Sequence, residues 1–195
     1  MKFKLLTALV ALFLPLAATV AQEVPAHPYL EIDTTEGRIL LELDGKAAPL
    51  TVAHVLSLVD AGFYDGLIFH RVIDGFMIQG GGYTPGFELK EDDRTIPNES
   101  GNGLANARGT IAMARTSDPH SANSQFFINV VDNYRLDPNK TPRTGSWGYT
   151  VFGKVIEGMD VVDQIASVPT GVQKGMRDVP QVPIIINSVR RYTFE

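Results

Sequence analysis

One arginine stands inside an apolar stretch, Phe69–Gly81, that also contains two phenylalanines, a methionine and a glutamine. In an extended chain alternate side chains share a face, so Arg71 can share a surface with residues that follow the turn at Asp74-Gly75. Such a surface could bind an apolar ring and donate a hydrogen bond to it. The alternative is a buried strand from which Arg71 reaches water through its aliphatic stem. This stretch alone favours neither interpretation.

Two further blocks follow it, a run of small residues in Gly109–Arg115 and the sequence SQFFIN in Ser124–Asn129. Taken in order with Phe69–Gly81, they resemble the cyclophilins, a family of peptidyl-prolyl isomerases whose signature has these three blocks. The resemblance extends from about Tyr29 to Tyr192, nearly the whole chain after its first segment. It implies a mainly β fold, an eight-stranded antiparallel β-barrel capped by two α-helices, and an enzyme that accelerates rotation about X–Pro bonds.

The chemistry that the resemblance implies needs no nucleophile, metal or cofactor. Rotation about an amide bond has a barrier of about 18–20 kcal/mol because it breaks the resonance of the amide. A catalyst therefore has to bind the twisted amide better than either planar form. Arg71 matches the catalytic arginine of the family, which donates to the prolyl nitrogen as its lone pair becomes localised. The alternative is a structural ion pair of Arg71 with Asp74 or Glu42.

The substrate-binding positions of the family also have counterparts in this chain. The resemblance implies an apolar slot for the proline ring, two glutamines that bond the substrate backbone and position the arginine, and a small residue along the bound peptide. The matching residues are Phe76, Met77, Phe127 and Leu136 in the slot, the glutamines Gln79 and Gln125, and the small residue Ala114. The alternative for the slot is ordinary core packing, which we accept for Phe126 because alternation places it on the interior face.

Three positions depart from the pattern of many eukaryotic cyclophilins. Arg115 stands where they have asparagine, Arg135 where they have tryptophan, and Tyr149 where they have histidine. We keep Arg115 and Tyr149 in the predicted substrate-binding set, since a tyrosine can still donate a hydrogen bond from the rim. The changes resemble bacterial periplasmic cyclophilins, and the missing tryptophan predicts low sensitivity to cyclosporin. The single tryptophan, Trp147, lies in an insertion at Pro138–Gly148 and is not expected to replace it.

A secretory signal peptide is expected over residues 1–21. The basic Met1–Lys4 precedes an apolar run too short to span a bilayer comfortably, and small residues lead to a cleavage point after Ala21. An uncleaved membrane anchor is the alternative. Residues 22–28 would then form a short tether and residues 29–195 the isomerase domain. With no cysteine in the chain, a bacterial envelope compartment, most simply the periplasm, fits best.

Composition argues against several other classes of protein. The formal net charge is −5, whereas a nucleic-acid-binding protein needs a basic face. The four histidines lack the spacing of a metal site, and we expect His70 to be a buried, hydrogen-bonded structural residue. A hydrolase would need partners for Ser121 or Ser124 that are not recognisable. The main alternative is a proline-peptide-binding or chaperone module, which could lose Arg71 and keep its apolar wall.

The elements that must position these residues follow from periodicity. Alternation predicts a hairpin of residues 29–33 and 38–43, and apolar residues at helical spacing predict a helix from Pro49 to near Gly62. The other predicted elements are a short helix through residues 159–166 and strands at 111–114, 126–131, 150–155 and 182–189, with loops over 82–109. We expect a monomer that acts on proline-containing, unfolded or partly folded polypeptides and binds no membrane after cleavage of the signal peptide.

Overall fold

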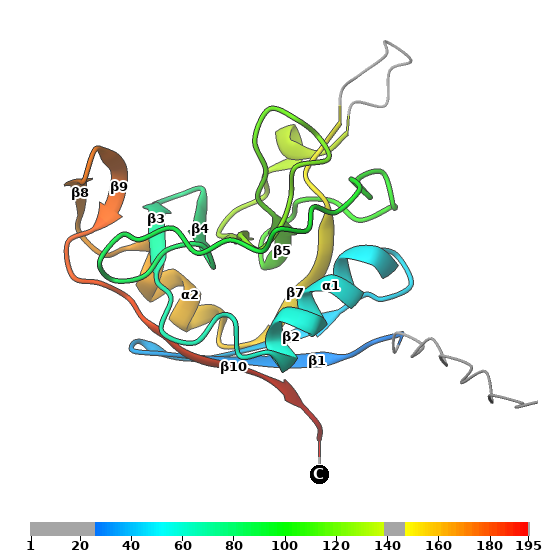
Figure 1. Cartoon of the computed structure of the whole chain (residues 1–195), viewed down its shortest axis with the longest axis horizontal. Coiled ribbons are helices and arrows are strands. Elements are labelled where there is room, and N and C mark those ends of the chain that lie inside the picture. The colour runs from blue at the N-terminus through cyan, green and yellow to red at the C-terminus, as the bar shows by residue number, and fades with distance from the viewer. Residues whose placement is uncertain (1–25, 139–146, 195) are drawn as a thin grey trace, which may run out of the picture.

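The structure is a computed structural model that describes residues 26–138 and 147–194. Eight strands form one antiparallel sheet in the order β10-β1-β2-β7-β5-β6-β4-β3, which curls around a core (Figure 1). Its strands are β1 (Tyr29–Thr34), β2 (Gly37–Leu43), β3 (Phe69–Ile73), β4 (Met77–Gly80), β5 (Thr110–Met113), β6 (Phe126–Asn129), β7 (Val151–Glu157) and β10 (Ile186–Tyr192). The two edges approach each other through an isolated bridge between Ile68 and Ile185.

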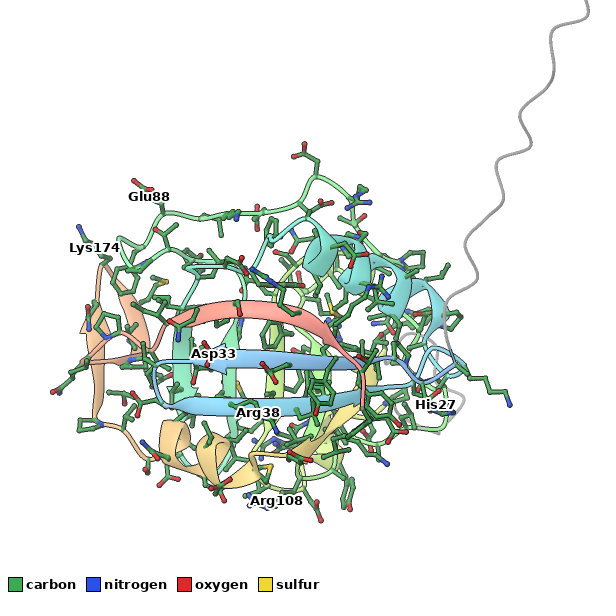
Figure 2. The ribbon with its side chains drawn as sticks, turned by 90° about the horizontal axis from the view of Figure 1, so that it is seen from below. His27, Asp33, Arg38, Glu88, Arg108 and Lys174 are labelled. Carbon is green, nitrogen blue, oxygen red and sulfur yellow. The ribbon has the colours of Figure 1, made fainter. Side chains whose placement is uncertain are left out.

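Two helices lie on opposite sides of these strands, α1 (Pro49–Asp60) and α2 (Met159–Ala166) (Figures 1 and 2). Pro49 stands in the first turn of α1, where the missing N–H has no intrahelical partner to lose. The apolar stripe of α1 is buried and packs beside β10. The expected eight-stranded antiparallel fold with two helices is thus confirmed. In the described part of the chain, no helix has the length and apolar character needed to cross a membrane.

The predicted signal peptide (residues 1–21) lies outside the described residues, as do most of the tether and of the insertion at 138–148. The predicted hairpin and both predicted helices are present. The predicted strands at 111–114, 126–131 and 150–155 correspond to β5, β6 and β7, with ends shifted by one or two residues. The stretch 82–109 contains only isolated bridges and no strand, as expected.

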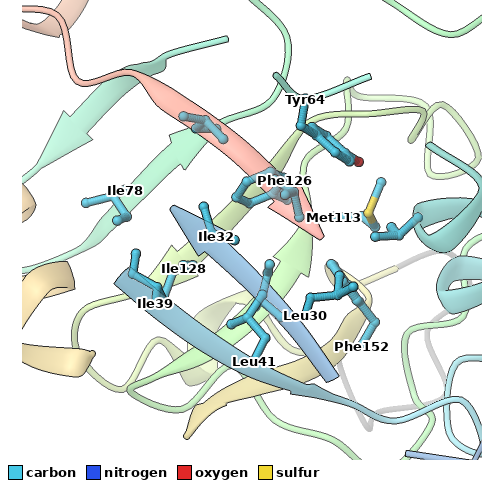
Figure 3. Close-up of a cluster of buried hydrophobic side chains, with 14 of the residues drawn as sticks. Leu30, Ile32, Ile39, Leu41, Tyr64, Ile78, Met113, Phe126, Ile128 and Phe152 are labelled. Carbon is cyan, nitrogen blue, oxygen red and sulfur yellow. The ribbon is translucent and has the colours of Figure 1, made fainter. Parts of the chain in front are cut away.

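Alternation along the strands creates two separate apolar faces. Phe126, Phe152 and their neighbours point into the main core (Figure 3), which joins the sheet to both helices. Their neighbours in the sequence, Phe127 and Val151, belong to a smaller outer cluster with Met77 and Ala112. Because successive side chains of a strand point to opposite faces, one sheet builds both the core and an outer apolar surface.

A break in strand register turns Arg71 toward this outer face. Phe69 pairs with Gly80 and Arg71 pairs with Gln79, so His70 is an extra residue on β3. Phe69 and Val72 both pack in the main core although they are three positions apart, which strict alternation would forbid. A β-bulge inserts one residue and re-aims the side chains that follow it. The bulge therefore places Arg71 on the outer side, beside Gln79.

The end of the chain differs from the prediction in two ways. The closing strand was expected at 182–189, but β10 begins at Ile186 and runs to Tyr192. Pro183 has no N–H to donate to a ladder, and the chain here makes only the isolated bridge at Ile185. A hairpin of β8 (Thr170–Gln173) and β9 (Met176–Pro180) precedes it and was not predicted.

Candidate active site

A cleft of about 120 Å³ lies on the outer face of the sheet. Nine of the ten predicted site residues line it, and they come from β3, β4 and the turn between them, β6, the segment after β5, and the segments that precede and follow residues 139–146. They are Arg71, Phe76, Met77, Gln79, Ala114, Arg115, Phe127, Leu136 and Tyr149. Gln125 is not among the lining residues but contacts one of them. The structure therefore brings together the residues that the sequence analysis selected.

The floor of the cleft is apolar and rigid. Met77 and Phe127 are almost fully buried, with 2% and 5% of their surface exposed. Leu136, Phe76 and Tyr149 are partly exposed and pack against them as walls. The rings of Phe127 and Tyr149 meet edge to face, with centroids 5.6 Å apart. Such a slot can enclose a small apolar ring on several sides, because flat aromatic walls keep their shape.

The polar side of the cleft contains Arg71 and a pair of glutamines. Gln79 lies directly across from Arg71 in the pairing of β3 with β4. The Nε2 of Gln79 donates a hydrogen bond to Oε1 of Gln125 at 3.1 Å, which ties β4 to the start of β6. The backbone N–H of Ala114 donates to the carbonyl of Gln125 at 2.9 Å. This side therefore offers a cation and amide groups next to an apolar slot.

Two further arginines stack on aromatic rings at the rim. The guanidinium of Arg115 lies 4.5 Å from the centre of the Tyr149 ring, and that of Arg135 lies 4.6 Å from the centre of the Phe76 ring. Arg115 also donates to the carbonyl oxygens of Trp147 at 2.8 Å and Gly148 at 3.3 Å. Arg115 thus fixes the segment that carries Tyr149, and both cations cover ring faces by cation–π attraction.

A network of buried asparagines beneath one wall was not predicted. Asn133 donates to the carbonyl of Phe76 at 2.9 Å and to the side-chain oxygen of Asn129 at 2.8 Å. Asn129 in turn donates to Thr110 at 2.9 Å and to Asn106 at 3.3 Å. These groups come from separate loops and strands, so no local sequence pattern marks them. Because buried amides need partners, the network holds the wall in one position.

Arg71 has a partner that the sequence analysis did not suggest. Its Nε lies 3.6 Å from Oδ2 of Asp178 on β9, and both side chains are 42% exposed. Among the described residues, no ion pair joins Arg71 to Asp74 or Glu42, the two structural partners considered above. Glu42 instead pairs with Lys154 at 3.1 Å. Arg71 is therefore held from the neighbouring hairpin.

His70, the extra residue of the bulge, is buried as expected. Only 5% of its surface is exposed, and its ring centre lies 4.7 Å from that of Tyr83. Its Nδ1 has no hydrogen-bond partner within the described residues, but the ring forms a hydrogen bond with the backbone of Ile68, in line with the expected hydrogen bonding. Burial, with a smaller contribution from the charge of Arg71, lowers the pKa of His70 to about 4. The ring is thus neutral near pH 7.

Two other results bear on alternative sites. Within residues 26–138 and 147–194, no three or more His, Asp and Glu side chains are grouped so that they could hold a metal ion. A larger cavity of about 330 Å³ lies between Leu104 and Lys154, next to His27. His27, next to this cavity, lies at one end of the molecule in Figure 2, and the tip of the β8–β9 hairpin, which packs against β3 on the side of Arg71, lies at the other end. The larger cavity contains none of the residues selected from the sequence.

Comparison with known proteins agrees with the family resemblance found in the sequence. Residues 29–191 match the family model of the cyclophilin-type peptidyl-prolyl cis-trans isomerases. The chain is 54% identical to a peptidyl-prolyl cis-trans isomerase of Streptomyces antibioticus, over 83% of this chain and 96% of the relative. It is 52% identical to peptidyl-prolyl cis-trans isomerase B of Escherichia coli, over 80% and 94% of the two chains.

The structure resembles those of solved cyclophilins as well. A cyclophilin-type isomerase of Cryptosporidium parvum superimposes with a TM-score of 0.71 at 26% identity, over 87% of this chain and 99% of that one. A second structure of that protein, determined in the presence of the dipeptide Ala-Pro, gives a TM-score of 0.69 at 27% identity, over 85% and 99% of the two chains. The match of nearly the whole described chain in sequence and in fold places this protein in the family of cyclophilin-type peptidyl-prolyl cis-trans isomerases.

Proposed function

We propose that this isomerase acts on exported, partly folded proteins in the bacterial periplasm, and that Arg71 is its catalytic residue. The substrate is a polypeptide segment with an X–Pro bond, whose ring enters the slot floored by Met77 and Phe127. The observation that carries the proposal is the position of Arg71. Its guanidinium lines the same cleft of about 120 Å³ as the apolar slot, so a bound proline lies beside a cation.

The chemistry follows from what changes as the amide twists. Rotation breaks the resonance of the amide and localises a lone pair on the prolyl nitrogen, which then accepts a hydrogen bond more strongly than in either planar form. A guanidinium that donates to this nitrogen stabilises the transition state more than the ground state, and only that difference accelerates the reaction. A preorganised donor of this kind is worth about 2.7–4 kcal/mol, judged by the donors of oxyanion holes.

The remaining site residues hold the peptide in register. Gln79 and Gln125 present amide groups for the substrate backbone, and Ala114 leaves room for the peptide beside β5. The neighbour from Cryptosporidium parvum was determined in the presence of Ala-Pro, which supports a proline-containing peptide as the ligand of this cleft. Tyr149 and Arg115 border the slot and favour one orientation of the segment that precedes or follows the proline.

The assignment to exported clients rests on the sequence of the N-terminus. A basic start, an apolar run and small residues before Ala21 form the pattern of a cleaved signal peptide. Newly exported chains contain X–Pro bonds that are cis in about 10–30% of unfolded molecules and exchange slowly, which creates a need for a catalyst. We further propose that the mature enzyme is a monomer free of the membrane.

The catalytic proposal is tested by measuring cis-to-trans isomerisation of a short X–Pro peptide with the wild type and Arg71→Ala. We expect the variant to be slowed at least about tenfold, which corresponds to about 1.4 kcal/mol of lost transition-state stabilisation. The peptide should still bind, because the slot is unchanged. A wild type that binds the peptide without accelerating the reaction would instead support the binding or chaperone module.

The location is tested separately, by fractionating bacteria that express the full chain and sequencing the N-terminus of the purified protein. We expect a periplasmic protein that begins at Gln22. A chain that starts at Met1 and sediments with the membrane would support the uncleaved anchor, and a chain retained in the cytoplasm would contradict export. Sedimentation of the purified mature protein distinguishes a monomer from a dimer.

A further inference from the structure

The β8–β9 hairpin packs against β3 beside the bulge that carries Arg71 (Figure 1). The hairpin turns through Lys174 and Gly175, whose φ angles of 51° and 81° form a two-residue turn with positive φ at both positions. Its strands lose register after Gly171, so β9 has an extra residue in the region of Asp178. The hairpin therefore brings a second strand irregularity close to the one in β3.

Asp178 itself has an uncommon backbone conformation. Its φ of 61° lies in the left-handed region, which L-residues other than glycine seldom adopt, although aspartate and asparagine tolerate it best. With the backbone in this conformation, the carboxylate of Asp178 lies 3.6 Å from the Nε of Arg71. Within the described residues, this carboxylate is the partner with which Arg71 forms an ion pair. A glycine would adopt this backbone conformation easily but would leave Arg71 without a carboxylate partner.

We propose that Asp178 is a positioning residue for Arg71. Its carboxylate attracts the Nε edge of the guanidinium, so the two terminal nitrogens remain available to the peptide in the cleft. The arginine side chain has many rotamers, and restricting them before the substrate binds lowers the entropy lost in reaching the transition state. Both groups are partly exposed, so the pair adds little to the stability of the fold. Its effect should grow when a bound peptide excludes water from the cleft.

The decisive experiment uses the mature enzyme, four single variants and one double variant. Asp178→Gly removes the carboxylate and relieves the backbone, and Asp178→Asn keeps the shape and the tolerance for positive φ but removes the charge. Lys174→Gly is the matched control, because it relieves a positive φ in the same hairpin at a side chain that projects outward at its tip (Figure 2). Arg71→Ala, alone and combined with Asp178→Gly, completes a double-mutant cycle.

We expect both Asp178 variants to lower kcat by about two- to tenfold, the range that corresponds to ordering one long side chain. KM and the thermal midpoint should change little, and Lys174→Gly should match the wild type. In the Arg71→Ala background, Asp178→Gly should have no further effect, because its influence passes through the arginine. If the hairpin had a purely structural role, the Asp178 variants would instead lower the thermal midpoint, and their loss of activity would persist in the Arg71→Ala background.

The inference rests on the proposed role of Arg71, and the two can fail separately. If Arg71→Ala is as fast as the wild type, the role of Arg71 is wrong and this inference is wrong with it. If Arg71→Ala is slow while both Asp178 variants keep full kcat, only the inference about Asp178 is wrong. An equal loss of activity from Asp178→Gly with and without Arg71 would also overturn it.

Discussion

The side chain of Gln125 lies directly against the backbone of Gly82. A β-carbon built on Gly82 would stand 2.5 Å from Cγ and 2.7 Å from Nε2 of Gln125, closer than real β-carbons come to any neighbour. Only glycine therefore allows Gln125 to take the position from which it accepts the hydrogen bond of Gln79. The loop after β4 thus helps to set the polar side of the cleft without contributing a side chain to it.

Replacing Gly82 by alanine should displace Gln125 and weaken the glutamine pair. We expect Gly82→Ala to lower kcat/KM for an X–Pro peptide by about three- to tenfold, comparable to losing one hydrogen bond in an oriented site. Gly86→Ala in the same loop is the matched control, since the nearest atom to its added β-carbon is 3.7 Å away. Equal activities of the two variants would contradict the role assigned to Gly82.

The adjacent residues Phe126 and Phe127 should separate stability from activity. Both side chains are buried, with 4% and 5% of their surface exposed, but Phe126 packs in the main core and Phe127 in the outer cluster. Phe126→Ala should lower the free energy of unfolding by about 3–5 kcal/mol. Phe127→Ala should lower it less and reduce kcat/KM by about tenfold or more, because it opens the slot.

Denaturant unfolding and peptide isomerisation, measured on both variants below their unfolding transitions, check this prediction. Phe126→Ala should keep most of its activity per folded molecule. If Phe126→Ala loses activity as strongly as Phe127→Ala while both are folded, the two faces of β6 are not as independent as the alternation implies.

Much of this site could be predicted from the sequence, because both strand alternation and the resemblance to the family can be recognised in short stretches of residues. Phe127 was assigned to the slot because it matches the family pattern, and strand alternation then assigned its neighbour Phe126 to the core. The bulge at His70 was missed, although Phe69 and Val72 are both strongly apolar at a spacing of three that a regular strand cannot bury on one face. Alternation therefore contained a signal for the bulge.

Other features depend on contacts that no local pattern encodes. Asp178 reaches Arg71 from a hairpin distant in the sequence, through a backbone conformation that cannot be read from an aspartate in a polar stretch. Asn106, Asn129 and Asn133 meet beneath the cleft wall from different segments. Long-range pairing of polar groups is specified by the whole fold, so these residues emerge only from the three-dimensional arrangement.

Sensitivity to cyclosporin should depend on Arg135. Its guanidinium stacks on the Phe76 ring at 4.6 Å. The family resemblance matches this position to a tryptophan of many eukaryotic cyclophilins. We expect the wild type to retain its activity at nanomolar cyclosporin, and Arg135→Trp to become more sensitive while it keeps its catalytic rate. Inhibition curves for the two proteins provide the test, and nanomolar inhibition of the wild type would contradict this prediction.

The stability of the fold should fall as the pH is lowered from about 6.5 to about 4. Burial lowers the pKa of His70 to about 4, whereas in the unfolded chain a histidine titrates near 6.5. In this window the unfolded chain binds a proton that the folded protein excludes, so the free energy of unfolding decreases with falling pH. The loss from His70 can reach about 3 kcal/mol, at about 1.4 kcal/mol per pH unit.

The slope should be shallower in a variant that cannot take up this proton. His70→Gln removes the titrating ring, and His120→Gln removes an exposed one as a control. The pKa of His54 is also lowered by burial, so part of the slope should remain. Urea unfolding between pH 7 and 4.5 avoids most of the titration of the ion-paired carboxylates, whose pKa values are lowered by their arginine partners. An unchanged slope in His70→Gln would show that His70 accepts its proton as readily in the folded protein as in the unfolded chain.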